Sequence, residues 1–91
     1  NVQSSDGTVL FGKIQHGGTF KTLCFCEHFH KTYFVVPCIK GFDLPIAPFK
    51  QWLLAHNVHL LNVAGNRESV FPGIENITKE FLITALSGWQ T

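Results

Sequence analysis

A run of small and polar residues, between an apolar segment and a helical pattern, is the part of the chain best suited to bind a ligand. It supplies a small-residue turn, a cation, a carboxylate and a hydroxyl, in the order Gly65, Asn66, Arg67, Glu68 and Ser69. A guanidinium such as that of Arg67 can hold a phosphate or carboxylate through two parallel hydrogen bonds. We therefore expect these residues to line a binding site. The alternative is that Arg67 and Glu68 pair in solvent and contribute little.

A second candidate site precedes the first helical pattern. Gly17 and Gly18 would let the backbone approach a ligand closely, and Thr19 adds a hydroxyl group. The free N–H groups at the start of a helix attract anions. We expect these three residues to take part in an anion site. The alternative is an ordinary tight turn in which Thr19 caps the helix.

Two cysteines and two histidines between Cys24 and His30 suggest a metal site, but helical geometry argues against it. Side chains two residues apart on a helix point to different sides, so the four cannot converge on one ion. A structural zinc ion needs four ligands. Cys24 also falls on the apolar side of the helical pattern, and we expect it to be buried. The sequence predicts no metal site and no cofactor.

The composition limits the classes of protein to which the chain can belong. Its 91 residues fit a single domain, residues 1–91, and 45% hydrophobic with 13% aromatic residues predict a folded chain. The formal net charge of +1 gives no basic face for sequence-independent binding of nucleic acid. The longest apolar run, residues 33–36, is too short to span a membrane. Three cysteines without a signal-peptide pattern indicate a reducing, cytoplasmic compartment.

Turn residues divide the chain into alternating strand and helix patterns. Strands are predicted at residues 8–11, 32–37 and 58–63. Helices are predicted at residues 19–30, from Pro45 or Pro48 to Asn57, and at residues 74–86 before Gly88. The order β-α-β-α-β-α predicts an α/β fold with a small, three-stranded, mainly parallel sheet and flanking helices.

The apolar pattern within these elements predicts how they are covered. Residues 32–37 are continuously apolar after the first, which is typical of a strand covered on both faces. Phe20, Leu23 and Cys24 have helical spacing and are predicted to form the apolar side of the first helix. A sheet of three strands has exposed edges, and nine phenylalanines leave apolar surface for a partner. We therefore expect a homo-oligomer.

Several segments closely resemble the molybdenum-carrier family. Residues 60–69 (LLNVAGNRES) and 72–74 (PGI) are similar to its C-terminal signature L-N-V-A-G-P-R-E-S followed by P-G-I. The D-G-T at residues 6–8 and the G-G-T at residues 17–19 are similar to two further family elements, and residues 31–36 occupy the place of a family strand. The resemblance spans nearly the whole chain.

The resemblance implies a Rossmann-like fold related to the nucleotide-binding superfamily that includes the LOG enzymes and DprA. By this resemblance Gly17, Gly18 and Thr19 would line a phosphate-type site. The crevice beside it would be lined by Gly65, Arg67, Glu68 and Ser69.

The chain also departs from the family pattern. The family's glycine-rich N-terminal unit is absent, Asn66 replaces a proline, and His16 stands where serine is common. The domain would thus be a truncated one, with a half-site that a second subunit completes. The alternative is that the chain has lost the ancestral chemistry.

Three functions remain open at this point. The first is a module that binds a nucleotide or nucleotide-derived ligand bearing phosphate, as a sensor or as a protein that sequesters the ligand. The second is an enzyme that cleaves a nucleotide or ribosyl bond, with Glu68 as the acid–base residue and Arg67 anchoring phosphate. The third is a structural or interaction fragment of a longer protein.

Overall fold

The computed structural model describes residues 2–12, 17–37, 44–66, 68–69 and 71–87. The elements follow the order β1 (Gly7–Phe11), α1 (Gly17–His28), β2 (Thr32–Val36), α2 (Ile46–Ala55), β3 (Leu61–Gly65) and α3 (Ile74–Ala85). The strands form a parallel sheet in the order β2-β1-β3. The predicted α/β fold with a small parallel sheet is therefore confirmed.

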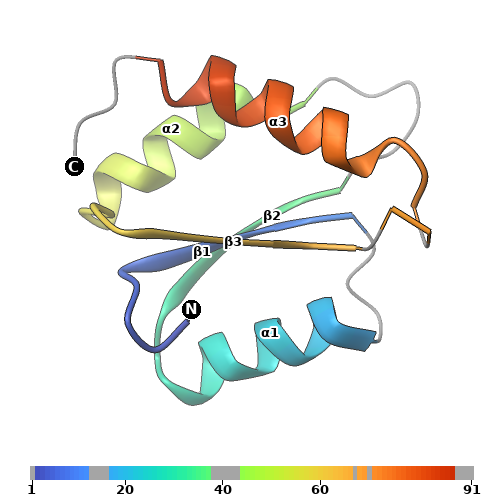
Figure 1. The fold of residues 1–91 in the computed structure, drawn as a ribbon. Helices are drawn as coiled ribbons and strands as arrows, with labels where there is room; N and C mark the ends of the chain where they lie inside the picture. The colour runs from blue at the N-terminus through green and yellow to red at the C-terminus, as the bar shows by residue number, and fades with distance from the viewer. Residues whose placement is uncertain (1, 13–16, 38–43, 67, 70, 88–91) are drawn as a thin grey trace.

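The helices cover the two faces of the sheet unequally. Helix α1 lies alone on one face, whereas α2 and α3 lie side by side on the other (Figure 1). This arrangement follows from right-handed crossovers between parallel strands. Each helix therefore returns the chain from the carboxyl edge of the sheet to its amino edge.

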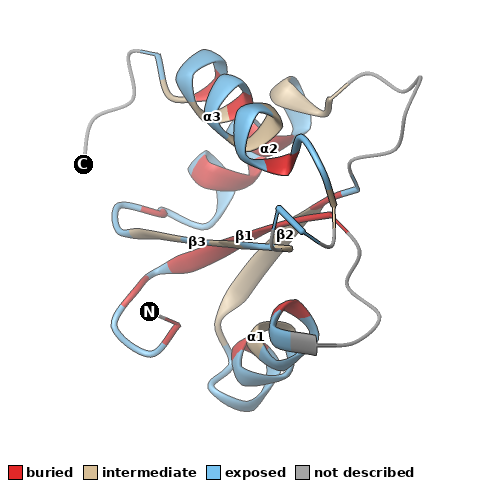
Figure 2. Ribbon diagram, turned by 45° about the vertical axis from the view of Figure 1, so that its right-hand side comes forward, coloured by how far each residue is buried: buried red, intermediate tan, exposed pale blue. Residues whose placement is uncertain are grey.

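Strand β1 is the central strand, and all five of its residues are buried (Figure 2). It pairs with both neighbours over its whole length, from Gly7 to Phe11. Residues 32–36 of the predicted strand form β2, which lies at an edge of the sheet and is half-buried except at the buried Val36. Its apolar side chains face the helices, and among the described residues no strand pairs with its outer edge.

An aromatic core fills the space between the sheet and the helix pair α2–α3. Phe49 lies at its centre, with ring centroids 5.1 Å from Phe81, 5.4 Å from Phe34 and 5.7 Å from Trp52. The Trp52 indole N–H donates a hydrogen bond of 2.8 Å to the Thr32 hydroxyl, which satisfies its one polar group. The second and third helices each bury one apolar side in this core, with Phe49, Trp52 and Leu53 from α2 and Ile74, Phe81 and Ala85 from α3.

Helix α1 turns a different side to the sheet from the predicted one. Thr19 and Cys26 are buried, whereas Phe20 and Cys24 are exposed and Leu23 is half-buried. Thr19 and Cys26 are seven residues apart and so lie on one side of the helix, as Phe20, Leu23 and Cys24 do. The small side chains of Thr19 and Cys26 let α1 lie close to β1. The predictions of an apolar side at Phe20 and of a buried Cys24 are therefore wrong.

Two boundaries also differ from the predicted ones. Helix α1 begins at Gly17, so the two glycines lie inside its first turn rather than before it. Strand β3 begins at Leu61, because Val58 instead closes the end of α2: its N–H donates to the Leu53 carbonyl at 3.0 Å and its side chain is buried in the core. Asn57 has φ 51°, the left-handed conformation expected where α2 ends.

The D-G-T segment fixes the alignment of β1 with β3. The Asp6 carboxylate accepts hydrogen bonds from the backbone N–H groups of His59 and Leu60, at 3.0 and 2.9 Å. The buried Thr8 hydroxyl accepts one from the Asn62 side-chain amide at 3.3 Å. A Cβ atom on Gly7 would lie only 3.0 Å from the Trp52 ring. Each of the three residues thus has a structural role in this chain.

Candidate functional site

The two sequence segments proposed to bind a ligand meet at the carboxyl edge of the sheet. The Asn66 backbone N–H donates to the Phe11 carbonyl at 3.2 Å, which extends the pairing of β1 and β3 by one residue. Its side-chain amide donates to the Thr19 hydroxyl, also at 3.2 Å. Asn66 therefore connects the end of β3 to the first turn of α1.

Close backbone packing makes this connection possible. Gly12 has φ +96°, and a Cβ atom there would overlap the amide oxygen of Asn66. A Cβ atom on Gly65 would meet Phe11 at 3.3 Å. Only glycine fits Gly12, because the left-handed backbone and the lack of space both exclude a side chain. Gly12 is not among the residues expected in the site, although a glycine directly after a strand pattern is the signal that could have identified it.

The first turn of α1 forms the positive end of the helix dipole and has no negatively charged side chain of its own. It contains no acidic residue, and Thr19 within it is only 4% exposed and accepts the hydrogen bond from Asn66. Gly18 is exposed, and a Cβ atom there would meet nothing within 4 Å. The backbone N–H groups at the start of a helix carry a partial positive charge, and the lack of an acidic residue in this first turn favours an anion at this position.

The first turn of α3 is closed by the protein's own carboxylate. The Glu68 side chain accepts hydrogen bonds from the backbone N–H of Gly73 and, at 3.2 Å, from that of Glu75. The structure thus gives Glu68 a capping role, while Ser69 beside it is exposed in the same turn. Arg67 lies outside the described residues.

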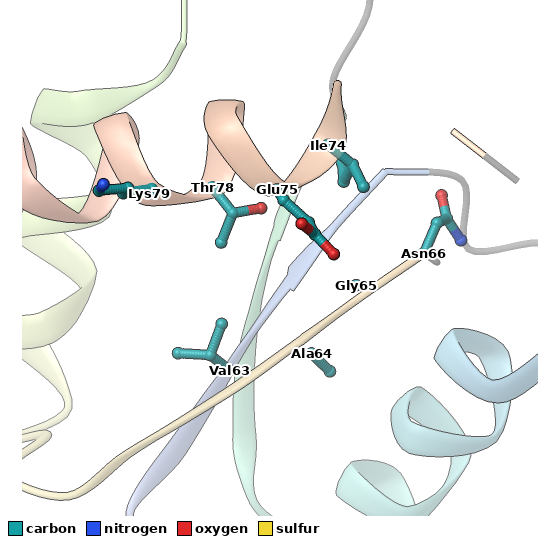
Figure 3. Close-up of a pocket in the computed structure, with 8 residues that line it drawn as sticks. All are labelled: Val63, Ala64, Gly65, Asn66, Ile74, Glu75, Thr78 and Lys79. Carbon is teal, nitrogen blue, oxygen red and sulfur yellow. The ribbon is translucent and has the colours of Figure 1, made fainter. Parts of the chain in front are cut away.

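A shallow hollow of about 320 Å³ lies between β3 and α3 (Figure 3). The strand contributes its floor, from Val63 to Asn66, and the helix contributes the side chains of Ile74, Glu75, Thr78 and Lys79. Glu75 and Lys79 bring one negative and one positive charge to its rim. The sequence analysis did not single out the three polar helix residues; their spacing of three and four residues on α3 is the signal that could have found them.

The perturbed titratable groups lie at the opposite edge of the sheet. Hydrogen bonds from the backbone N–H groups of Leu60 and His59 lower the pKa of Asp6 below its usual value. Burial and the neighbouring Glu27 carboxylate, which accepts a hydrogen bond from Tyr33 at 3.3 Å, raise the pKa of Tyr33. These shifts belong to structural contacts and not to the candidate site.

Metal coordination finds no support in the described part of the chain. No group of three or more histidine, cysteine, aspartate or glutamate side chains is placed there to hold an ion. Of the cysteines in that part, Cys24 is exposed and Cys26 is buried, so the two lie on different sides of α1. The described part of the candidate site therefore offers backbone N–H groups and neutral side chains at α1, and the charged side chains of Glu75 and Lys79 at the hollow beside α3.

Comparison with known proteins places this geometry in a family. A family model described as the circularly permutated YpsA SLOG family matches residues 1–86. The chain belongs to this family. Among the curated proteins, none gives a significant match.

A solved structure confirms the fold of this YpsA SLOG family member. The crystal structure of the "Putative molybdenum carrier protein" from Syntrophus aciditrophicus is similar to it with a TM-score of 0.78 and 28% sequence identity. The match covers 93% of this chain and 55% of the other, so the chain spans about half the length of that protein. The resemblance to molybdenum-carrier proteins is thereby confirmed. In the described ranges no helix has the length and apolar character to cross a membrane.

Proposed function

We propose that this YpsA SLOG protein is a binding module for a nucleotide or nucleotide-derived ligand that bears phosphate. The observation that carries the proposal is the first turn of α1, which contains no acidic residue and which Asn66 joins to β3. The family supports a nucleotide-related ligand-binding fold. The chain would act as a sensor, or it would sequester the ligand.

The proposed site divides the ligand between two places. The phosphate is held by the backbone N–H groups of Gly17, Gly18 and Thr19. The remainder of the ligand extends past Gly65 and Asn66 toward the hollow between β3 and α3, whose apolar floor and charged rim suit a flat, polar ring. The sequence also assigns Arg67 and Ser69 to this site.

The contacts of Glu68 favour binding over catalysis. Both of its carboxylate oxygens accept backbone hydrogen bonds from the start of α3. A carboxylate held in this way stabilises the turn that carries Ser69, and it is oriented toward the helix rather than toward a ligand. In this proposal Glu68 therefore positions the wall of the site, and a bond-cleaving role for it has no structural support.

Native mass spectrometry provides the first test. The purified protein, or the protein mixed with a panel of nucleoside mono-, di- and triphosphates, is expected to carry a nucleotide-sized adduct that denaturation releases. Failure of every nucleotide in the panel, and of inorganic phosphate, to bind would refute the proposal.

A matched pair of variants at Gly18 locates the phosphate. Gly18→Asp supplies α1 with its own carboxylate in open space, and we expect it to weaken nucleotide binding roughly tenfold to hundredfold through like-charge repulsion. Gly18→Asn has nearly the same shape without the charge and is expected to bind almost as the parent does. Equal affinity of the two variants, measured by calorimetry, would place the phosphate elsewhere.

A further inference from the structure

Strand β3 forms an edge of the sheet without the features that usually protect an edge. Residues 60–65 contain no charged residue and no proline. The opposite edge strand, β2, is bounded by Lys31 and Pro37. Because charges and prolines are the common means of preventing strands from pairing with another chain, their absence marks β3 as the edge that is open to pairing.

The hydrogen bonds of β3 define which of its backbone groups face outward. The Leu60 carbonyl accepts from the Asp6 N–H at 2.8 Å, and the Asn66 N–H donates to the Phe11 carbonyl. Both therefore face β1. Since the direction alternates along a strand, the N–H and C=O groups of Leu61, Val63 and Gly65 face away from the sheet.

Apolar side chains lie beside this outward edge. Val63 is 44% exposed and Phe25, on α1, is 54% exposed. Phe25 and Phe29 contact each other with ring centroids 6.4 Å apart, and both line a second hollow of about 510 Å³ on the α1 face of β3. Val63 lines this hollow as well as the one beneath α3, so the edge is open on both faces.

We propose that β3 pairs antiparallel with β3 of a second copy of this chain, about a two-fold axis at Val63. Every outward N–H and C=O group of the strand then finds a partner, since Val63 lies opposite Val63 and Leu61 lies opposite Gly65 of the second copy. On the α1 face Asn62 lies opposite Ala64. Leu61 and Asn62 thus each meet a smaller residue, the two Val63 side chains meet at the axis, and the two sheets join into one sheet of six strands.

A second copy fits this edge better than an unrelated strand does. Two copies of the uncharged strand β3 can pair without charge repulsion. The two-fold axis also brings the Phe25–Phe29 pairs of the two copies to the same face of the joined sheet. Strand pairing alone buries little apolar surface, and these rings with Val63 supply the apolar contact. Gly65 and Asn66 lie at the end of the paired strand, so the partner also forms a wall of the hollow beside α3. The pairing does not depend on the proposed ligand.

Sedimentation equilibrium with two proline variants tests the proposal. The parent is expected to have twice the 10.2 kDa mass of the chain. Val63→Pro removes an outward N–H and no hydrogen bond within the sheet, and it is expected to weaken the dimer about tenfold or more. Val35→Pro on β2 is the control at the other edge. The Val36 carbonyl accepts a hydrogen bond from the Gly12 N–H and so faces β1, and the backbone groups of the neighbouring Val35 therefore face outward. It is expected to remain dimeric.

A cross-linking measurement gives a result even if a proline variant does not fold. Val63→Cys places two thiols opposite each other at the two-fold axis, so a short thiol-specific reagent is expected to link two chains. Val35→Cys and the parent are expected to give only the background from the native cysteines. A monomeric parent, a dimer that survives Val63→Pro, or equal cross-linking at positions 35 and 63 would each overturn the proposal.

Discussion

Helices α1 and α3 both begin at the carboxyl edge of the sheet, yet only the first turn of α3 holds carboxylates. The first turn of α3 contains Glu75 and is capped by Glu68, so the protein's own carboxylates occupy it. The first turn of α1 contains no acidic residue and presents an exposed Gly18. Equivalent places in a fold therefore do not provide equivalent sites, and the carboxylates supplied by the chain decide which helix end is left for an external anion.

The largest effect is expected from the glycine that keeps the α1 side in place. Gly12→Ala should destabilise the protein by about 2–3 kcal/mol, because it combines an unfavourable backbone conformation with overlap onto Asn66. Gly73→Ala at the start of α3 is the matched control, with a similar φ of +90° but nothing within 4 Å of the added Cβ atom. It should cost about 1 kcal/mol. Urea unfolding measures both, and a loss no larger for Gly12→Ala would contradict the role of Asn66.

Removing the cap of α3 tests the other side of the comparison. Glu68→Ala should lower stability by about 1 kcal/mol and leave nucleotide affinity nearly unchanged. Glu80→Ala removes the same charge from an exposed position beyond the first turn of α3, and it should be nearly neutral. Chemical denaturation and calorimetry on the two variants separate the roles. A large loss of binding with unchanged stability would restore Glu68 as a ligand-contacting residue.

The smallest effect is expected at the amino edge, where Asp6 caps the entry to β3. Its pKa is lowered in the folded protein, so the carboxylate stabilises the fold above its usual pKa of 3.8 and loses this contribution as the pH falls through the lower, folded value. Asp6→Asn should be less stable than the parent at neutral pH, and the difference should shrink in acid. Thermal unfolding across this pH range measures it; a constant difference would show that Asp6 acts through shape rather than charge.

The sequence predicted the type and order of the elements because each carries a strong local signal. The spacing of Ile74, Ile77 and Phe81 defined α3, and Asn57 marked the end of α2. The order of strands in the sheet has no local signal, since it depends on contacts between segments far apart in the chain. For this reason the sequence could not place β1 at the centre.

The candidate site shows the same limit. Thr19 and Asn66 were both expected in it, but their hydrogen bond joins residues 47 positions apart and could not be inferred from either loop alone. Glu68 was a plausible ligand-binding residue by type, and only the structure shows its carboxylate directed at α3. Helical spacing was also ambiguous for α1, where Thr19 and Cys26 are buried in place of the more apolar Phe20.

The central position of β1 has a consequence for how the chain folds. Of the three strands β1 is synthesised first, yet it pairs with a strand on each side, and its Gly7 lies opposite Thr32 and Leu61. The second pairing closes a long loop, which is slow to form because its chain entropy is lost before its contacts are made. During synthesis the edge of β1 that receives β3 therefore stays uncovered until Leu61–Gly65 have emerged from the ribosome. A chaperone that shields short apolar strands would act on this nascent segment.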